Sequence, residues 1–184
     1  MLSVRSVVKN YSKGGNLSAE TKPQVGIVMG SDSDLDVMKA AANVLQEFGV
    51  AFEITIASAH RSPQRAAIWA HAARERGIKV IIAGAGHAAH LAGAMAAHTS
   101  LPIIGVPIDS SCLQGLDALL ATVQMPPGIP VATMAIGKPG ARNAGILAAQ
   151  IIATSDPALG EKLDDFKTEM ARQVAKKAAA VESL

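Results

Sequence analysis

The chain has 184 residues, of which 49% are hydrophobic and 3% aromatic, and its formal net charge is +2 at pH 7. This length predicts one domain with an aliphatic core, and the low charge, without a basic stripe, argues against a nucleic-acid partner. No apolar run reaches transmembrane length, and the single cysteine, Cys112, excludes an internal disulfide, which is typical of a cytoplasmic protein.

Residues 1–22 are polar and show no sustained hydrophobic period, so we expect a flexible N-terminal arm there. Arg5, Lys9 and Lys13 precede the first acidic residue, Glu20, which leaves an organelle transit segment as the alternative. We expect no secretion signal, because the segment lacks an apolar h-region.

After this arm, strand-like and helix-like segments alternate five times along the chain. The apolar, β-branched runs that predict strands are 25–29, 51–57, 79–83, 102–106 and 130–136. Helical periodicity follows each run, over 35–48, 63–76, 88–98, 113–123 and 141–154. This alternation predicts an α/β fold, a three-layer αβα domain with a doubly wound, five-stranded parallel sheet. The carboxyl ends of parallel strands share one edge, where ligands bind in such folds.

The loop Gly30-Ser31-Asp32-Ser33-Asp34 follows the first strand and leads into the first helix. Glycine permits a close backbone approach, while seryl hydroxyls and the free amides of a helix N-terminus attract an anion. The Gly-Lys-Ser/Thr ending of a Walker loop is missing, and two aspartates would repel a triphosphate. We therefore interpret the loop as a site for a ribose monophosphate, with a simple helix cap as the alternative.

The stretch Ser58-Ala59-His60-Arg61-Ser62-Pro63 follows the second strand, and its proline is well placed to open the next helix. It puts a titratable imidazole beside a guanidinium at the carboxyl end of a strand. Histidine can gain and lose a proton near neutral pH, whereas arginine stays charged and can grip a phosphate or carboxylate. The motif favours acid–base chemistry on an anionic ligand. The alternative is a capped helix beside a surface histidine and arginine.

A third loop, residues 84–91 with the sequence GAGHAAHL, follows the third strand. Its Gly-x-Gly-x-x-Ala pattern, with Asp109 beyond the next strand, formally satisfies the dinucleotide-binding fingerprint. That fingerprint belongs in the first βα turn, and this turn is the third, so we favour small residues that let the backbone approach a flat ring. His90 reaches the same pocket in this interpretation, and a helix-packing role for it stays open.

Beyond the predicted sheet, Pro157 begins a late helix over 157–180, with an apolar stripe at helical spacing formed by Leu163, Phe166, Met170 and Val174. A complete sheet leaves little core for this helix to cover, so we expect its stripe to pack on a neighbouring subunit. The predicted organisation is a flexible arm over 1–22, a catalytic α/β domain over 23–156 and a C-terminal helical arm over 157–184.

The three loops occur in one chain with further distinctive stretches. These are LQGLD at 113–117, VQMP at 123–126, GIPVAT at 128–133 and AIGKPGARNA at 135–144. Together they resemble the N5-carboxyaminoimidazole ribonucleotide mutases of the PurE type, class I, over about residues 24–170. The resemblance implies a flavodoxin-like, homo-octameric enzyme of purine biosynthesis, without a metal or organic cofactor. Its reaction moves a carboxylate from N5 to C4 of an aminoimidazole ribonucleotide.

The resemblance also implies roles for particular residues. His60 would be the proton carrier, acting as general acid and base. The residues implied to hold the ribose phosphate are Gly30, Ser31, Asp34, Ser58 and Arg61, and those implied to line the imidazole and carboxylate site are Ala85, Gly86, His90 and Leu91. Three residues depart from the expected pattern: His87 replaces a glycine, Ala92 a proline and Cys112 an alanine. A side chain at position 87 would strain the loop if the backbone there is left-handed, and we expect Cys112 to be a small buried side chain.

Two alternatives stay open at this stage. The related aminoimidazole ribonucleotide carboxylase, which uses free carbon dioxide, would share the ribose-phosphate loops, although Gln124-Met125-Pro126 and the GAG-x-AAH pattern favour the mutase. A non-catalytic nucleotide-binding or receiver-like module fits the fold alone. A receiver would need an acceptor aspartate after the third strand, where this chain has Gly84.

Overall fold

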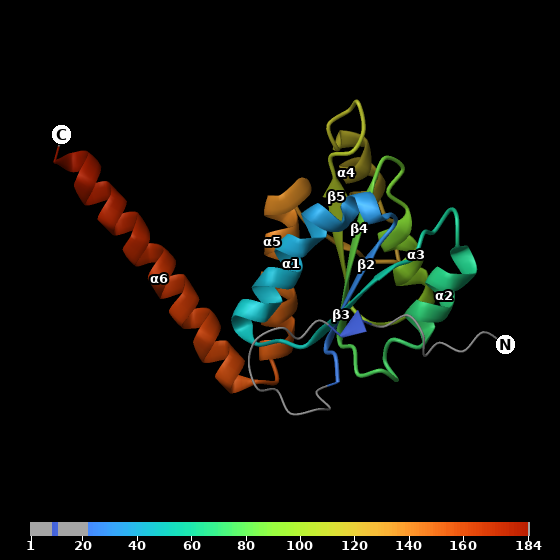
Figure 1. The fold of residues 1–184 in the computed structure, drawn as a ribbon, viewed down its shortest axis with the longest axis horizontal. Coiled ribbons are helices and arrows are strands. Elements are labelled where there is room, and N and C mark those ends of the chain that lie inside the picture. Colours follow the sequence, from blue (N-terminus) through green and yellow to red (C-terminus); the bar gives the residue numbers. More distant parts are fainter. Residues whose placement is uncertain (1–8, 11–21, 184) are drawn as a thin grey trace.

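The computed structural model describes residues 9–10 and 22–183 (Figure 1). The strands are β1 (Lys9–Asn10), β2 (Val25–Met29), β3 (Phe52–Ile56), β4 (Val80–Gly86), β5 (Ile103–Ile108) and β6 (Ala132–Thr133). The helices are α1 (Leu35–Phe48), α2 (Pro63–His71), α3 (Leu91–His98), α4 (Leu116–Val123), α5 (Gly137–Ala153) and α6 (Pro157–Glu182), with a 3-10 turn, η2, at Asp32–Asp34.

The sheet has the strand order β1-β3-β2-β4-β5-β6. The five strands from β2 to β6 are parallel, which confirms the predicted doubly wound sheet. The short strand β1 pairs antiparallel with β3 and adds an edge that the sequence did not predict. It lies within the segment predicted to be a flexible arm, of which residues 1–8 and 11–21 lie outside the described residues.

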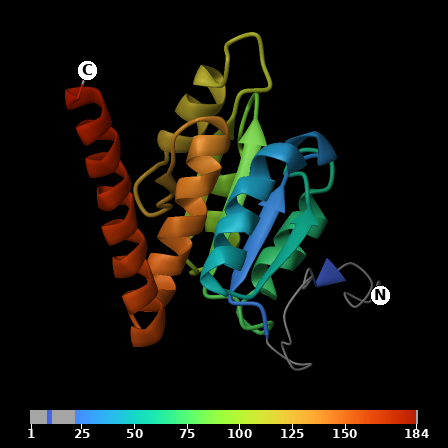
Figure 2. The same ribbon diagram turned by 60° about the vertical axis from the view of Figure 1, so that its left-hand side comes forward.

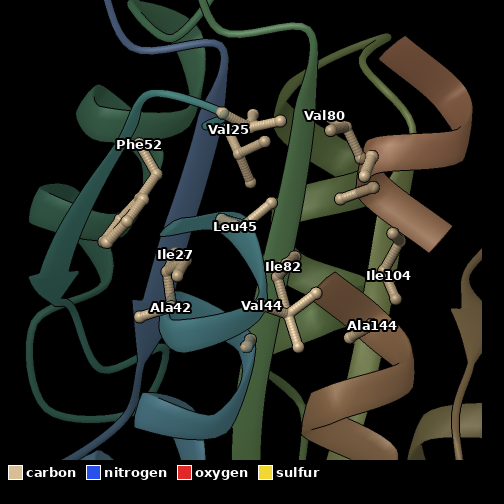
Figure 3. Close-up of a cluster of buried hydrophobic side chains, with 14 of the residues drawn as sticks. Val25, Ile27, Ala42, Val44, Leu45, Phe52, Val80, Ile82, Ile104 and Ala144 are labelled. Atoms are coloured by element: carbon tan, nitrogen blue, oxygen red, sulfur yellow. The ribbon is translucent and has the colours of Figure 1, made fainter. Parts of the chain in front are cut away.

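Successive residues of a strand point to opposite faces of the sheet, and different helices cover the two faces. On one face, Ile27, Ile82 and Ile104 pack against α1 and α5, as Figure 3 shows. On the other face, Val28 and Ile81 join the buried residues of α2 and α3. This burial on both faces explains why the strands are continuous apolar runs. It also confirms the three predicted layers.

Close packing of α1 on α5 relies on small residues. A Cβ added at Gly145 would lie 2.8 Å from the carbonyl oxygen of Ala41, so the two helix backbones nearly touch. Four buried alanines continue this surface on α5, at positions 141, 144, 148 and 149. A core with few aromatic residues can therefore be dense. Gly49 ends α1 in the left-handed conformation, with φ 74°, which is common for a glycine after the last turn of a helix.

Helix α2 is shorter than its sequence period predicted, because Arg76 folds back on it. The guanidinium donates to the carbonyl of Trp69 at 3.0 Å and to the buried carboxylate of Glu53 at 2.8 Å. These two contacts cap the helix and tie the following turn to β3. The turn closes at Gly77, whose φ is 99°.

Strand β4 is longer than predicted, at the expense of α3. Its pairing with β5 continues to Gly86, opposite Ile108, because backbone hydrogen bonds outweigh the weak strand propensity of glycine and alanine. Gly84 therefore lies inside the strand, paired with Met29, instead of in a tight turn. The dinucleotide fingerprint needs that turn, so the dinucleotide interpretation is wrong.

The two halves of α6 have different surroundings. Leu163 is buried on its own chain, and the ring of Phe166 packs edge-to-face on Phe48, with centroids 5.5 Å apart. Met170 and Val174 are exposed on the half that leaves the body (Figures 1 and 2). The expectation that all four stripe residues pack on a neighbouring subunit is therefore wrong for Leu163 and Phe166, because α6 begins against α1 and α5 of its own chain.

Two further observations concern the surface. Cys112 is exposed, so the expectation of a buried side chain is wrong; it lies in the loop between β5 and α4. No helix among the described residues combines the length and apolar character needed to cross a bilayer.

Candidate functional site

A pocket of about 270 Å³ opens at the carboxyl edge of the sheet, where the loops after β2, β3, β4 and β5 meet. It is lined by Gly30, Ser31, Ser33, Asp34, Ser58, Ala59, His60, Arg61, Ala85, Gly86, His87, Ala88, His90, Leu91 and Ser110. All ten residues that the sequence singled out are among them. Their roles toward a ligand stay predictions, but the structure brings them together in one place.

The first loop is organised by a capping box. The amide of Ser31 donates to Oδ2 of Asp34 at 3.1 Å, and the amide of Ser33 donates to Oγ of Ser31 at 3.4 Å. Asp34 is only 5% exposed. Burial raises the pKa of this carboxyl above the usual 3.8, while hydrogen bonds from Ser31 and Ser33 and the charge of Arg61 act against the rise. The loop thus holds a buried carboxylate at the base of the pocket wall.

The second loop is tied to the first by Arg61. Its Nη2 donates to the carbonyl of Gly30 at 3.0 Å, and its amide donates to Oγ of Ser58 at 3.1 Å. The Arg61 side chain is exposed along the pocket, so its remaining N–H groups are available to an anion. Pro63 opens α2, as predicted. The two loops therefore form one anion-attracting wall.

Two imidazoles from different loops are in contact at the pocket. Nε2 of His60 lies 2.9 Å from Nδ1 of His90, with ring centroids 4.9 Å apart and planes at 71°. A hydrogen bond between two ring nitrogens requires one of them to carry a proton and the other to accept it. The pair can therefore hold one shared proton and pass it between its rings. Such a group can act as acid in one step and as base in another.

The third loop contains the histidine that departs from the expected family pattern. His87 has φ 53°, a left-handed conformation that is uncommon for a residue with a side chain. Its Nδ1 lies 3.0 Å from Oγ of Ser110, which follows β5. A Cβ at Gly86 would collide with that same hydroxyl, so only glycine lets the serine lie there. The predicted condition for strain at position 87 is thus met.

Sequence reasoning missed Ser110 as a pocket residue. Ser33, Ala59 and Ala88 were likewise not singled out, although each lies in a loop that was. The signal for Ser110 was available, because it follows the fourth parallel strand of the predicted sheet and so must lie at the same edge.

Comparison with known protein families finds a match over most of the chain. The family model for AIR carboxylase matches residues 24–173 of the chain. The chain belongs to the AIR carboxylase family. This confirms the family resemblance that the loop motifs suggested.

Curated relatives in the AIR carboxylase family match most of the chain. It is 56% identical to an N5-carboxyaminoimidazole ribonucleotide mutase from Thermotoga maritima over 162 residues, which cover 88% of this chain and 94% of that protein. It is 58% identical to a mutase of the same name from Bacillus subtilis over 144 residues, 78% of this chain and 89% of that protein. It is also 52% identical to a phosphoribosylaminoimidazole carboxylase from Saccharomyces cerevisiae, covering 92% of this chain and 29% of that longer protein.

A solved structure supports the fold. The chain is similar to PurE from Treponema denticola with a TM-score of 0.77 and 26% sequence identity, over 85% of this chain and 97% of that one. The predicted α/β architecture of the AIR carboxylase family is therefore confirmed.

Proposed function

We propose that this chain is an N5-carboxyaminoimidazole ribonucleotide mutase, an isomerase of purine biosynthesis. The observation that carries the proposal is the His60–His90 pair, with its nitrogens 2.9 Å apart, inside a pocket whose other wall attracts anions. The support from relatives is their identity of 56–58% over most of the chain. The reaction calls for no metal or organic cofactor. A cytoplasmic location is part of the proposal.

The substrate's ribose phosphate binds between the first two loops. Ser31 and Ser58 offer hydroxyls, and Arg61 supplies a charge that persists at working pH. Gly30 contributes a surface without a side chain, so the nucleotide can approach the backbone closely. The carboxylate of Asp34 accepts from the sugar hydroxyls. Its hydrogen bonds from Ser31 and Ser33 hold this buried carboxylate in a fixed position at the pocket.

His60 carries the proton that the rearrangement moves. As N5–C bond cleavage releases carbon dioxide, N5 takes a proton from protonated His60. C4 then attacks carbon dioxide, and the new C–C bond leaves C4 with an excess proton. Neutral His60 removes that proton, which restores both the imidazolium and the aromatic ring. The partner nitrogen of His90 holds His60 in place and can share the proton between the two steps.

Carbon dioxide has to stay beside the ring between the two bond changes. The small residues Ala85 and Gly86 form a wall that the ring can approach, and Leu91 supplies a buried apolar surface. His60 and His90 are exposed in the single chain, so the bound nucleotide and a neighbouring subunit have to cover the pocket.

A carboxylase is the second candidate, because the yeast relative and the family description both carry that activity in their names. One assay separates the two. The purified protein receives N5-carboxyaminoimidazole ribonucleotide without bicarbonate or ATP, and the C4-carboxylated product is measured. Product formation supports the mutase. Dependence on bicarbonate, with aminoimidazole ribonucleotide as the only substrate used, would support the carboxylase, and no product under either condition would remove both.

Assembly into a homo-octamer is part of the proposal. Leu113, Leu116, Leu120 and Val123 form a helically spaced, half-exposed apolar stripe on and before α4. The distal half of α6 adds a second one, with Met170, Val174 and Val181. Apolar surfaces of this kind are typical of subunit contacts, and another copy of the chain is the proposed occupant.

Truncation after Thr168 tests the role of α6 while keeping the buried contacts of Leu163 and Phe166. We expect light scattering to show a smaller assembly than the full chain forms. Leu163→Ala is the control, because it weakens the fold by about 2–5 kcal/mol without touching the distal stripe. An octamer that survives the truncation would exclude the distal half of α6 from assembly. A monomeric full chain would exclude the octamer.

A further inference from the structure

We propose that His87 is an additional substrate-binding residue, which donates a hydrogen bond from Nε2 to the carboxylate that the enzyme transfers. The inference rests on the proposed function and adds to it a residue that the family pattern does not lead one to expect. Its starting point is the hydrogen bond of 3.0 Å between Nδ1 of His87 and Oγ of Ser110, at the wall of the pocket.

His87 is exposed, and two features of its loop restrict where its ring lies. Its backbone is left-handed, with φ 53°, and a residue with a side chain keeps such a conformation only where its surroundings impose it. Ser110 anchors one ring nitrogen, and the absence of a Cβ at Gly86 is what allows Ser110 to come so close. Backbone strain of this kind is found most often at binding sites and active sites, and His87 lies at the wall of a pocket.

The anchored ring leaves one nitrogen for a ligand. Among residues 22–183, Nδ1 bonds to Ser110 and Nε2 has no hydrogen-bond partner. When the serine hydroxyl donates to Nδ1, the neutral ring carries its proton on Nε2, and the protonated ring carries one there as well. In both states Nε2 is then a donor. A donor suits an anionic group, which is the kind of ligand that the rest of the pocket attracts.

The position of His87 in the fold favours the carboxylate, rather than the phosphate, as the group that it binds. The phosphate is proposed to lie at Ser31, Ser58 and Arg61, on the loops after β2 and β3. His87 and Ser110 instead follow β4 and β5, on the side of Gly86 where the ring and its carboxylate are proposed to bind. The charged or titratable groups that share the pocket are His60, His90, Arg61 and Asp34.

Two nucleotides that differ only in the carboxylate test this assignment. Calorimetry compares 4-carboxy-5-aminoimidazole ribonucleotide with 5-aminoimidazole ribonucleotide, on the wild type and on His87→Asn. Asparagine tolerates φ above zero and keeps an atom near the Nδ1 position, but it has none at Nε2. We expect about tenfold weaker binding of the carboxylated nucleotide, the size of one hydrogen bond to a charged group, and unchanged binding of the other.

Further variants separate binding from a structural role. His87→Gly relieves the strained φ, so it should raise the melting temperature. It should also weaken binding of the carboxylated nucleotide, as His87→Asn does. His87→Gln, which restores an N–H near the Nε2 position, should recover part of the affinity. In turnover, the loss should appear in KM more than in kcat.

His87 does not bind the carboxylate if His87→Asn and His87→Gly lower the affinity for both nucleotides equally, or if they change neither affinity. Those outcomes are distinct from failure of the proposed function, which would show as a wild type that does not convert N5-carboxyaminoimidazole ribonucleotide.

Discussion

Two pairs of histidine rings lie at opposite ends of the same two helices. His60 and His90 come just before or at the start of α2 and α3, whereas His71 and His98 are the last residues of these helices. The ring centroids are 4.9 Å apart in the first pair and 5.1 Å in the second. Only the first pair lines the pocket, with a hydrogen bond of 2.9 Å between its nitrogens. Two neighbouring imidazoles therefore do not by themselves make a ligand-binding pocket.

The location of the first pair explains the difference. In a parallel sheet, the helix N-termini and the strand carboxyl ends meet at one edge, where free amides and loops from several strands converge. Arg61 and the first loop join His60 at that edge. The second pair lies at the opposite edge, where α2 and α3 end. Variants at matched positions of the two edges can test whether the chemistry depends on this placement.

The largest expected effect separates the two histidine pairs. His60→Asn keeps the size and a hydrogen-bonding edge but cannot carry a proton, so kcat should fall at least about 100-fold, as is typical of general acid–base catalysis. His71→Asn, made on the same helix at the other edge, should leave kcat within about twofold, as expected of a surface change away from the site. Turnover of N5-carboxyaminoimidazole ribonucleotide provides the measurement. Near wild-type activity in His60→Asn would remove His60 from its proposed role.

A smaller effect is expected from the arginines. Arg61→Ala should weaken binding of the phosphorylated nucleotide by about tenfold or more, because a charge-assisted hydrogen bond to phosphate is lost. Arg74, which donates to Ser100 at 3.0 Å beyond the end of α2, provides the control. Calorimetry on Arg61→Ala and Arg74→Ala gives the comparison. Equal affinities for the two variants would exclude a phosphate contact from Arg61.

The smallest expected effect is on the pH dependence of stability, and it has opposite signs for Asp34 and Asp36. Burial raises the pKa of Asp34 above 3.8, so its contribution to stability is present below that pH and is lost as the pH rises through the raised pKa. Lys138 lies 2.7 Å from Asp36 and lowers the pKa of that carboxyl, so its contribution is present above 3.8 and is lost as the pH falls.

The matched amide variants should therefore diverge with pH. Between about pH 3 and pH 7, the melting temperature of Asp34→Asn should rise relative to the wild type, and that of Asp36→Asn should fall. The second change is the weaker one, since an exposed ion pair is screened by solvent and salt. Parallel pH profiles for the two variants would contradict the assigned environments.

Much of the fold could be predicted because its signals are local. The apolar run at 25–29 and the helical period at 35–48 agree with β2 and α1 to the residue. The predictions that failed depended on distant partners. Arg76 ends α2 early by reaching back to Trp69 and across to Glu53, and the pairing of β4 with β5 carries a strand through residues that have weak strand propensity.

The sequence by itself determined the kinds of groups at the site and the edge at which they lie, because strand and helix periods and loop motifs are properties of neighbouring residues. It also pointed to His87 as a departure with a conformational consequence. Only the tertiary structure decided that Nε2 of His60 meets Nδ1 of His90 and that Ser110 holds His87. Those distances depend on the order of strands in the sheet and on the absence of a Cβ at Gly86, which no periodicity encodes.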